Sequence, residues 1–234
     1  MTLPVIHAWI FVRSGSIRFA ERNSQLLNGK PLIDYTIEAA KKSRYIKDVF
    51  VSTDSPEIAA IAEQYGAIVP FLRPAELSTD MTPVQMAWKH AVEWNRQQTE
   101  FPKMDIMVSL PMTVPMRTAD EITQAIDLYM EGNCDSVIAV TRSNRHPAYD
   151  MVYLQGDDAS LVLPNDDPFA RKRVSEVYDI TNMLHVCSAD AAVEHKNYLS
   201  KRTKAIIVPL EHSFDIRTKW DFKLAEMMLK ENVK

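Results

Sequence analysis

The sequence has no apolar run that approaches the ~20 residues of a membrane-spanning helix. Its first residues also lack the basic region and apolar core of a secretion signal. Positive charge is not in excess, because the formal net charge is −4, and such a chain does not favour a nucleic-acid-binding surface. We therefore expect a cytoplasmic protein that binds neither membranes nor nucleic acids, with any basic site confined to a few residues.

Cysteine is scarce as well. Only Cys134 and Cys187 occur, without the close spacing of a zinc or redox motif, so we expect two buried, reduced thiols. The Walker pattern G-x-x-x-x-G-K-[ST] and the dinucleotide pattern G-x-G-x-x-G are both missing. Internal repeats and low-complexity tracts are absent too. These absences exclude disulfide scaffolds, P-loop proteins and repeat arrays.

What is present is the alternation of a single α/β domain. The 234 residues are 46% hydrophobic and 25% charged, which suits one well-buried core. Short apolar runs alternate with segments of helical spacing, and right-handed β-α-β crossovers then predict a three-layer α/β/α, Rossmann-like fold with a mostly parallel sheet. The predicted strands are 5–12, 49–51, 67–69, 105–110, 135–140, 182–187 and 205–210; the predicted helices are 31–43, 56–65, 83–94, 119–130, 189–198 and one from 218 onward.

Two of these helices carry apolar residues that we expect to face the core. The helix from 83 onward has Met86, Ala87, His90, Ala91 and Trp94, and the last helix has Trp220, Phe222, Leu224 and Met228. His90 is expected to be a packed residue rather than a ligand.

Residues 142–178 interrupt the succession of strands and helices. An apolar run ends at Leu154 and is followed by turn residues at 155–158, which predicts a hairpin that leaves the main sheet. An excursion of roughly 35 residues is too long for an ordinary loop. We predict an inserted functional or dimer-forming arm.

The first strand breaks abruptly into Arg13-Ser14-Gly15-Ser16, and Arg18 and Arg22 follow within ten residues. In open α/β sheets, ligands bind beyond the carboxyl ends of the strands. Backbone N–H groups, Ser hydroxyls and guanidinium forks together suit phosphate oxygens. This loop is either a phosphate cradle or simply a solvated basic turn.

The spacing of Arg13, Ser16, Arg22 and Asn23, followed by N-G-K-P-L at 28–32, resembles the first signature of the acylneuraminate branch of nucleotide-sugar cytidylyltransferases. Further segments resemble the same family in the same order. They are V-S-T-D at 51–54, R-P-A-E-L-x-x-D at 73–80, T-V-P-M-R-T at 113–118, D-S-V at 135–137, H-P at 146–147 and S-F-D-I at 213–216.

The resemblance implies an enzyme that binds CTP and an acidic 2-keto sugar of the sialic acid type. The anomeric hydroxyl attacks the α-phosphorus, giving a CMP-sugar and pyrophosphate, with Mg²⁺ as cofactor and a homodimer as the assembly. The implied catalytic residues are Arg13, Arg22 and Asp215, with Asp215 as the metal ligand. The implied nucleotide-binding residues are Arg13, Ser14, Gly15, Ser16, Arg22, Asn23 and Arg73, and the implied substrate-binding residues are Thr113, Arg117, Arg171, Tyr178 and Arg217.

The chain also departs from the family pattern. Ile17 stands in place of a Lys, Pro111-Met112-Thr113 replaces Q-P-T, and Asp179 replaces an Arg. Arg217 stands where the family has a second metal carboxylate; it could contact phosphate directly, or pair with Asp215, since residues two apart in an extended segment share a side. Two alternatives therefore stay open: a homologue that binds nucleotide or a partner without catalysis, and a nucleotidyltransferase with another base or acceptor.

Overall fold

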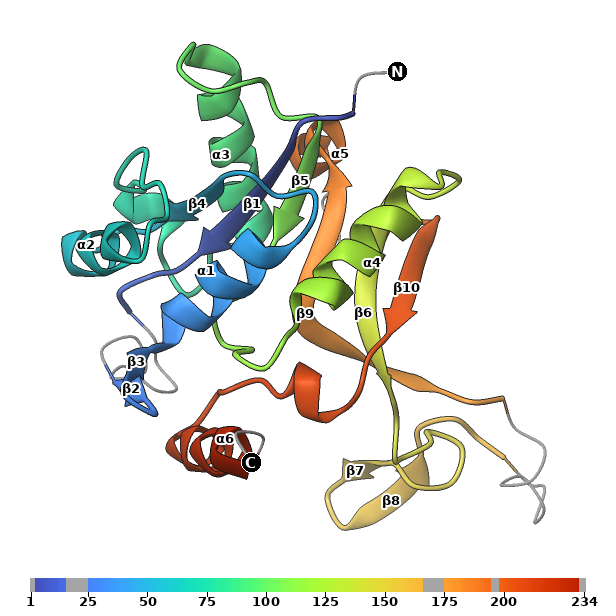
Figure 1. The fold of residues 1–234 in the computed structure, drawn as a ribbon. Coiled ribbons are helices and arrows are strands. Elements are labelled where there is room, and N and C mark those ends of the chain that lie inside the picture. Colours follow the sequence, from blue (N-terminus) through green and yellow to red (C-terminus); the bar gives the residue numbers. More distant parts are fainter. Residues whose placement is uncertain (1–2, 16–24, 166–174, 195–197, 232–234) are drawn as a thin grey trace.

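The computed structural model describes residues 3–15, 25–165, 175–194 and 198–231. Its centre is a six-stranded sheet of strand order β10-β6-β9-β5-β1-β4 (Figure 1). β9 runs antiparallel to β5 and β6, whereas the other neighbouring strands are parallel. The strands are β1 (Ile6–Phe11), β4 (Val49–Ser52), β5 (Ile106–Ser109), β6 (Ser136–Arg142), β9 (Tyr178–Ser188) and β10 (Thr203–Ile207). The predicted α/β fold with a mostly parallel sheet is confirmed.

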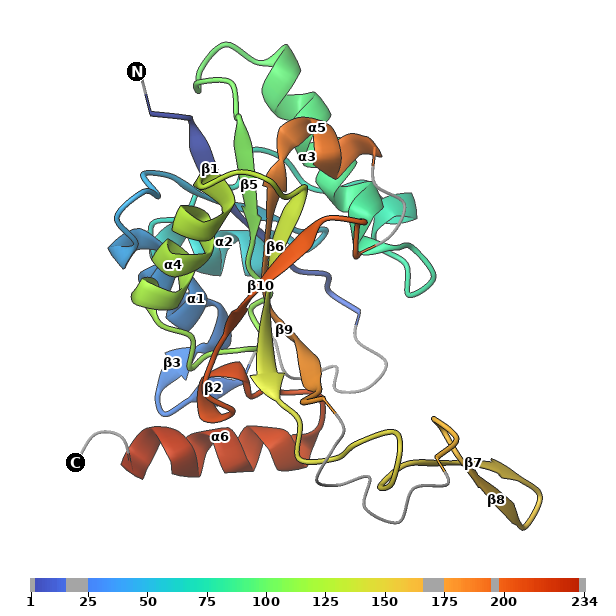
Figure 2. The same cartoon turned by 90° about the vertical axis from the view of Figure 1, so that its right-hand side faces the viewer.

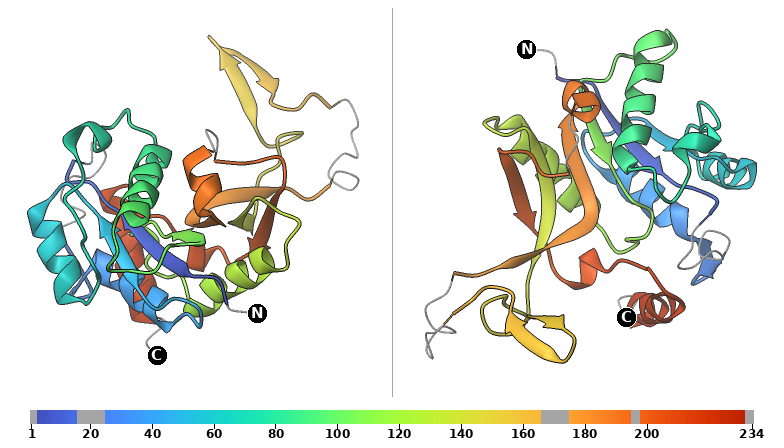
Figure 3. Two further views of the ribbon diagram at one scale, coloured as in Figure 1. Left: turned by 90° about the horizontal axis from the view of Figure 1, so that it is seen from above. Right: turned by 180° about the vertical axis from the view of Figure 1, so that it is seen from behind.

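Successive residues of each strand point to opposite faces of the sheet, and the core is divided accordingly. Ala8 and Ile10 belong to a cluster covered by α1, α2 and α4, whereas Trp9 belongs to a second cluster covered by α3 and α5 (Figures 1 and 3). The helices are α1 (Leu32–Lys42), α2 (Pro56–Gln64), α3 (Val84–Gln97), α4 (Ala119–Met130), α5 (Ala189–Glu194) and α6 (Lys219–Glu231). Smaller elements are the 3-10 turns η2 (Ala75–Leu77) and η4 (Glu211–Ser213) and the short ladder of β2 (Leu26–Leu27) with β3 (Lys30–Pro31).

The helix ends follow the sequence signals. Ser55 accepts a hydrogen bond from the backbone N–H of Ile58 at 3.2 Å and so caps α2. At α4, Thr118 and Glu121 form a reciprocal capping box, in which the Glu121 carboxylate accepts from the Thr118 N–H at 2.8 Å. Local sequence therefore sets where these two helices begin.

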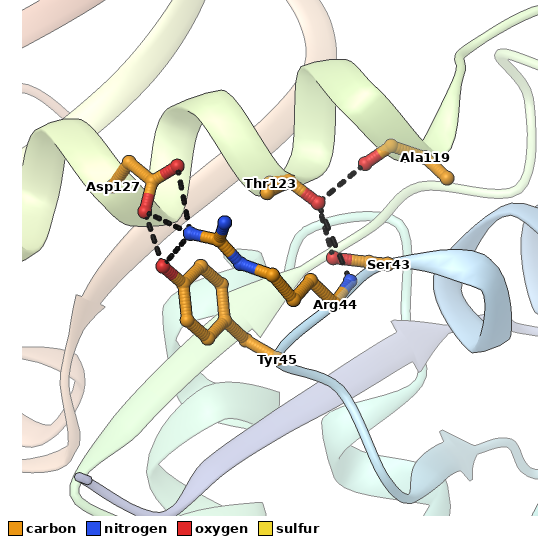
Figure 4. A network of polar contacts seen from close by, with 6 residues as sticks. All are labelled: Ser43, Arg44, Tyr45, Ala119, Thr123 and Asp127. Carbon is orange, nitrogen blue, oxygen red and sulfur yellow. Dashed lines mark hydrogen bonds and ion pairs between the residues drawn. The ribbon is translucent and has the colours of Figure 1, made fainter.

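A polar network joins the end of α1 to the outer side of α4 (Figure 4). The hydroxyls of Ser43 and Thr123 lie 3.0 Å apart, and Arg44 forms an ion pair with Asp127 at 3.0 Å. Tyr45 also hydrogen-bonds to Asp127. These contacts fix two neighbouring helices of the same layer relative to each other.

Several sequence predictions are corrected by the structure. Residues 67–69 contribute only an isolated bridge, between Ile68 and Phe50, rather than a strand. On α6, Trp220 is 72% exposed and Leu224 is 44% exposed, so neither belongs to the core. On α3, Trp88 is buried whereas the predicted core residue Met86 is exposed. The predicted strand 182–187 begins earlier, because β9 continues the pairing with β6 out to residue 178.

The hairpin predicted within residues 142–178 is present. It consists of β7 (Val152–Gln155) and β8 (Asp158–Leu161), which pair only with each other and extend away from the main sheet (Figure 2). Val152, Tyr153 and Leu154 are all more than half exposed there. The hairpin therefore presents apolar side chains to its surroundings.

Both cysteines are free, as expected. Cys187 is buried as predicted, whereas Cys134, which was also expected to be buried, is only half-buried. Burial raises the pKa of the Cys187 thiol to about 12, which keeps it protonated at neutral pH. In the part of the chain that the structure describes, none of the helices has the length and apolar character needed to cross a membrane.

Candidate active site

The strands β1, β4 and β5 are parallel, so the loops that follow them meet at one edge of the sheet. A cavity of about 330 Å³ lies at this edge. Its wall includes Arg13, Arg73 and Thr113, which come from three separate loops. The structure thus brings together three of the residues that the sequence predicted for nucleotide and sugar binding.

Arg13 and Ser14 follow β1 and are each held by an aspartate from elsewhere in the chain. The Arg13 guanidinium forms an ion pair with Asp80, and both side chains remain more than a third exposed. Ser14 donates twice to Asp54, from its backbone N–H at 2.7 Å and from its hydroxyl at 2.6 Å. Burial alone would raise the pKa of Asp54, but the bonds from Ser14 and the charge of Arg73 lower it. Asp54 therefore stays ionised and fixes the loop.

Arg73 is buried and bridges the ends of two strands. Its Nη2 donates to the carbonyl of Val12 at 2.9 Å, its Nη1 to the carbonyl of Ser52 at 3.3 Å, and its Nε to the hydroxyl of Ser78 at 3.0 Å. Burial lowers its pKa. All three guanidinium nitrogens are engaged, so Arg73 shapes the cavity wall and adds fixed positive charge to it.

Thr113 and Arg117 belong to the segment between β5 and α4, but they lie in different places. The Thr113 hydroxyl is buried on the cavity wall, and no partner for it occurs among the described residues. Arg117 is only 4% exposed and lies behind the wall, where it donates to Thr36 Oγ1 at 3.0 Å and to the Pro111 carbonyl at 2.5 Å. Burial lowers the pKa of Arg117 to about 9. With these contacts, Arg117 supports the cavity wall from behind.

Asp215 and Arg217 lie between η4 and α6. Their side chains form an ion pair, with Arg217 Nε 2.9 Å from Asp215 Oδ2. The Asp215 side chain is 12% exposed and that of Arg217 57% exposed. Neither lines the cavity described above, but the intervening Ile216 donates its N–H to the Thr113 carbonyl at 2.8 Å. Asp215 and Arg217 are thus the sequence neighbours of a residue that is hydrogen-bonded to the cavity wall.

The sequence predicted a magnesium ion at Asp215. Mg²⁺ binds through carboxylate and phosphate oxygens and needs negative charge in its surroundings. Within the described ranges, no three His, Cys, Asp or Glu side chains come together as a metal site would require. Among the described residues, the Arg217 guanidinium forms an ion pair with Asp215, so the donor set does not fit the predicted ion.

The far wall of the cavity was not identified from the sequence. It contains Trp88 of α3, Asn182 and His185 of β9, and Tyr198. The rings of Trp88 and His185 lie 4.8 Å apart, as do those of His185 and Tyr198. Asn182 and His185 lie in the segment that begins at Asp179, where the chain departs from the family pattern, and no role was assigned to them from the sequence. Trp88 was not identified because the face of α3 and the antiparallel β9 meet only in the folded chain.

The remaining predicted residues are placed as follows. Tyr178 begins β9 at the base of the arm, where its hydroxyl donates to Glu176 at 2.9 Å, and it does not line the cavity. At Gly15, a Cβ would meet no described atom within 4 Å, so close packing does not explain this glycine. The predicted residues Ser16, Arg22, Asn23 and Arg171 lie outside the described residues.

Comparison with known proteins gives a consistent result. The family described as Cytidylyltransferase matches residues 8–231. The CMP-N,N'-diacetyllegionaminic acid synthase of Legionella pneumophila is 32% identical over 231 residues, covering 97% of each chain. The N-acylneuraminate cytidylyltransferase of Escherichia coli is 33% identical over 223 residues, which are 94% of this chain and 51% of that relative.

A solved structure has the same fold. It is a CMP:2-keto-3-deoxy-manno-octonic acid synthetase complexed with CTP, with a TM-score of 0.70 and 15% sequence identity over 97% of this chain and 99% of that one. At this identity the likeness concerns the fold alone.

Proposed function

The chain belongs to the cytidylyltransferase family and is a nucleotidyltransferase related to the acylneuraminate cytidylyltransferases; from this premise we propose that it transfers CMP from CTP to an acidic 2-keto sugar. The observation that supports the proposal most strongly is the cavity at the carboxyl edge of the sheet, with Arg13 and Arg73 on its wall. Two guanidinium groups at this edge suit the charge of a nucleoside triphosphate.

In the proposed reaction, the anomeric hydroxyl oxygen of the sugar forms a bond to the α-phosphorus of CTP. The bond from that phosphorus to the pyrophosphate oxygen breaks, and the hydroxyl proton passes to solvent. Arg13 neutralises phosphate charge from the loop after β1, and the fixed charge of Arg73 adds to the field at the wall. Phosphoryl transfer depends mainly on this kind of positioning and charge stabilisation.

The acceptor is proposed to be a nine-carbon keto acid of the kind named in the relatives' descriptions. The legionaminic acid and N-acylneuraminate enzymes are similar to this chain over most of its length. Trp88, His185 and Tyr198 give the far wall an aromatic surface, with Asn182 as a polar group beside it. Such a wall suits the non-ionic side of a substituted sugar, while the anionic groups face the arginines.

A second candidate function has one observation in its favour. The contact of Arg217 with Asp215 leaves the predicted metal ligand neutralised, which would suit a homologue that binds nucleotide without turning it over. A pyrophosphate-release assay decides between the two. We expect release with CTP, and not with ATP, GTP or UTP, in the presence of N-acetylneuraminate, legionaminic or pseudaminic acid and Mg²⁺. CTP binding without release for any of these acceptors would favour the second candidate.

A further inference from the structure

The segment that carries Asp215 and Arg217 is fixed on both sides. Ile216 is fully buried, and its N–H donates to the Thr113 carbonyl at 2.8 Å, so the backbone is tied to the cavity wall. Since alternate residues of an extended segment share a side, Asp215 and Arg217 both point away from the core position of Ile216. In Figure 1 this segment passes below the sheet on its way to α6.

The start of α6 holds the backbone of Arg217. Asp221 Oδ2 accepts from the N–H of Arg217 at 2.9 Å and from the N–H of Thr218 at 2.7 Å, while Thr218 Oγ1 accepts from the N–H of Asp221 at 3.2 Å. This is a capped helix start, and such caps restrict the chain that enters the helix. The Asp221 carboxylate is therefore committed to the backbone.

The charged groups around Asp215 leave the positively charged guanidinium of Arg217 facing the solvent. Arg217 contacts its carboxylate directly, and the buried Arg117 adds positive charge from behind, since Asp215 is one of the two carboxylates that counteract the effect of burial on the Arg117 pKa. The other carboxylate, Glu121, contacts His212 at 2.7 Å. Of the pair, Asp215 is nearly covered and Arg217 is more than half exposed. A divalent cation would meet a guanidinium here, whereas an anion would meet a positioned hydrogen-bond donor.

Building on the proposed function, we propose that Arg217 binds an anionic oxygen of a substrate, with Asp215 as the residue that positions its guanidinium. On this proposal Asp215 holds no metal ion, and the guanidinium of Arg217 supplies the positive charge at this place. The anionic oxygen belongs either to the phosphate chain of the nucleotide or to the carboxylate of the keto acid. Both present pairs of anionic oxygens that a guanidinium can contact with two N–H groups.

The metal-binding half of the proposal is tested by Mn²⁺ binding to the full chain, measured by electron paramagnetic resonance without nucleotide. Wild type and Asp215→Asn are expected to bind Mn²⁺ equally weakly, because Asp215 is already neutralised. Arg217→Asp places a second carboxylate beside it and is expected to gain a site. Loss of Mn²⁺ binding in Asp215→Asn, with an unchanged melting temperature, would show that Asp215 is a metal ligand after all.

The anion-binding half is tested by calorimetry in EDTA, with CTP and N-acetylneuraminate titrated separately. Arg217→Gln is expected to weaken one of the two ligands about tenfold or more, and Arg217→Lys to restore part of the affinity, as a charge-assisted hydrogen bond predicts. The ligand affected identifies the anion. Unchanged affinity for both ligands would overturn the proposal.

These results are separable from the proposed reaction. Binding that depends on Arg217, without pyrophosphate release for any acceptor, would remove the enzymatic proposal and keep the role of Arg217. If the wild-type chain releases pyrophosphate but its Arg217→Gln variant binds both ligands normally, the enzymatic proposal is kept and the role of Arg217 is removed.

Discussion

Arg13 at the end of β1 forms an ion pair with Asp80, which lies in the loop that follows Arg73. Both side chains are more than a third exposed, so the pair adds little to stability. Because Arg13 and Asp80 both line the cavity, their ion pair affects ligand binding. Phosphate oxygens that enter the cavity compete with the Asp80 carboxylate for the same guanidinium.

From this relationship we expect Arg13→Ala to abolish detectable CTP binding, since it removes a charge-assisted contact to the triphosphate. Asp80→Asn should leave CTP affinity unchanged or raise it by about two- to threefold, because an exposed ion pair is worth only ~0.5 kcal/mol. Calorimetric titration of CTP measures both. Wild-type affinity in Arg13→Ala would remove this residue from the site.

Arg117, in contrast to Arg13, is expected to contribute to the stability of the fold rather than to ligand binding. Its replacement by Met leaves the Pro111 carbonyl and the Thr36 hydroxyl without their donor, and we expect the free energy of unfolding to fall by about 2–4 kcal/mol. Urea denaturation measures this change. Arg13→Ala is the matched control, with a change of at most about 0.5 kcal/mol. A stable Arg117→Met variant that lost only substrate affinity would restore Arg117 to direct substrate contact.

The sequence predicted those parts of this fold that depend on local patterns. The caps at Ser55 and Thr118 involve residues three positions away, and the helices that they cap begin at the predicted residues, 56 and 119. The family resemblance implied binding roles for Arg13, Arg73 and Thr113, and the structure places all three on the wall of one cavity.

Long-range packing accounts for what was not predicted. An apolar run does not encode whether its strand is parallel or antiparallel, so the contribution of His185 from β9 to the cavity was not foreseen. Trp220 was expected to be buried, but α6 contacts the core through a narrow stripe that includes Phe222 and Ala225, and Trp220 lies outside it. The burial of Arg117 was not visible either, because motif spacing carries no information about solvent access.

His7 of β1 gives the stability of the protein a dependence on pH. It is buried against Phe50, with ring centroids 4.8 Å apart, and neither ring nitrogen has a partner among the described residues. Burial lowers its pKa from 6.5 to about 4, opposed by the charges of Asp48 and Asp105. The native protein thus keeps His7 neutral at pH values where the unfolded chain binds a proton.

Between pH 6.5 and about 4 the unfolded state holds more protons at this residue, so stability falls as the pH falls through this window. The loss reaches roughly 3 kcal/mol at the lower end. We expect His7→Phe and His7→Leu to show a shallower decline in unfolding free energy between pH 7 and pH 4.5, measured by urea denaturation. An identical slope in wild type and both variants would mean that His7 is protonated in the native state.

The apolar side chains of β7 are expected to form a contact between two copies of the chain. Tyr153 is 64% exposed and Leu154 is 71% exposed, on a hairpin that pairs with no other part of the described chain. Adjacent exposed apolar residues on a projecting element are typical of a protein interface. We expect a homodimer in sedimentation equilibrium and monomers for the double variant Tyr153→Ser, Leu154→Ser. Trp220→Ser, which alters a residue that is 72% exposed on α6, is the matched control and should remain dimeric. Dissociation by the control variant alone would move the interface from the arm to α6.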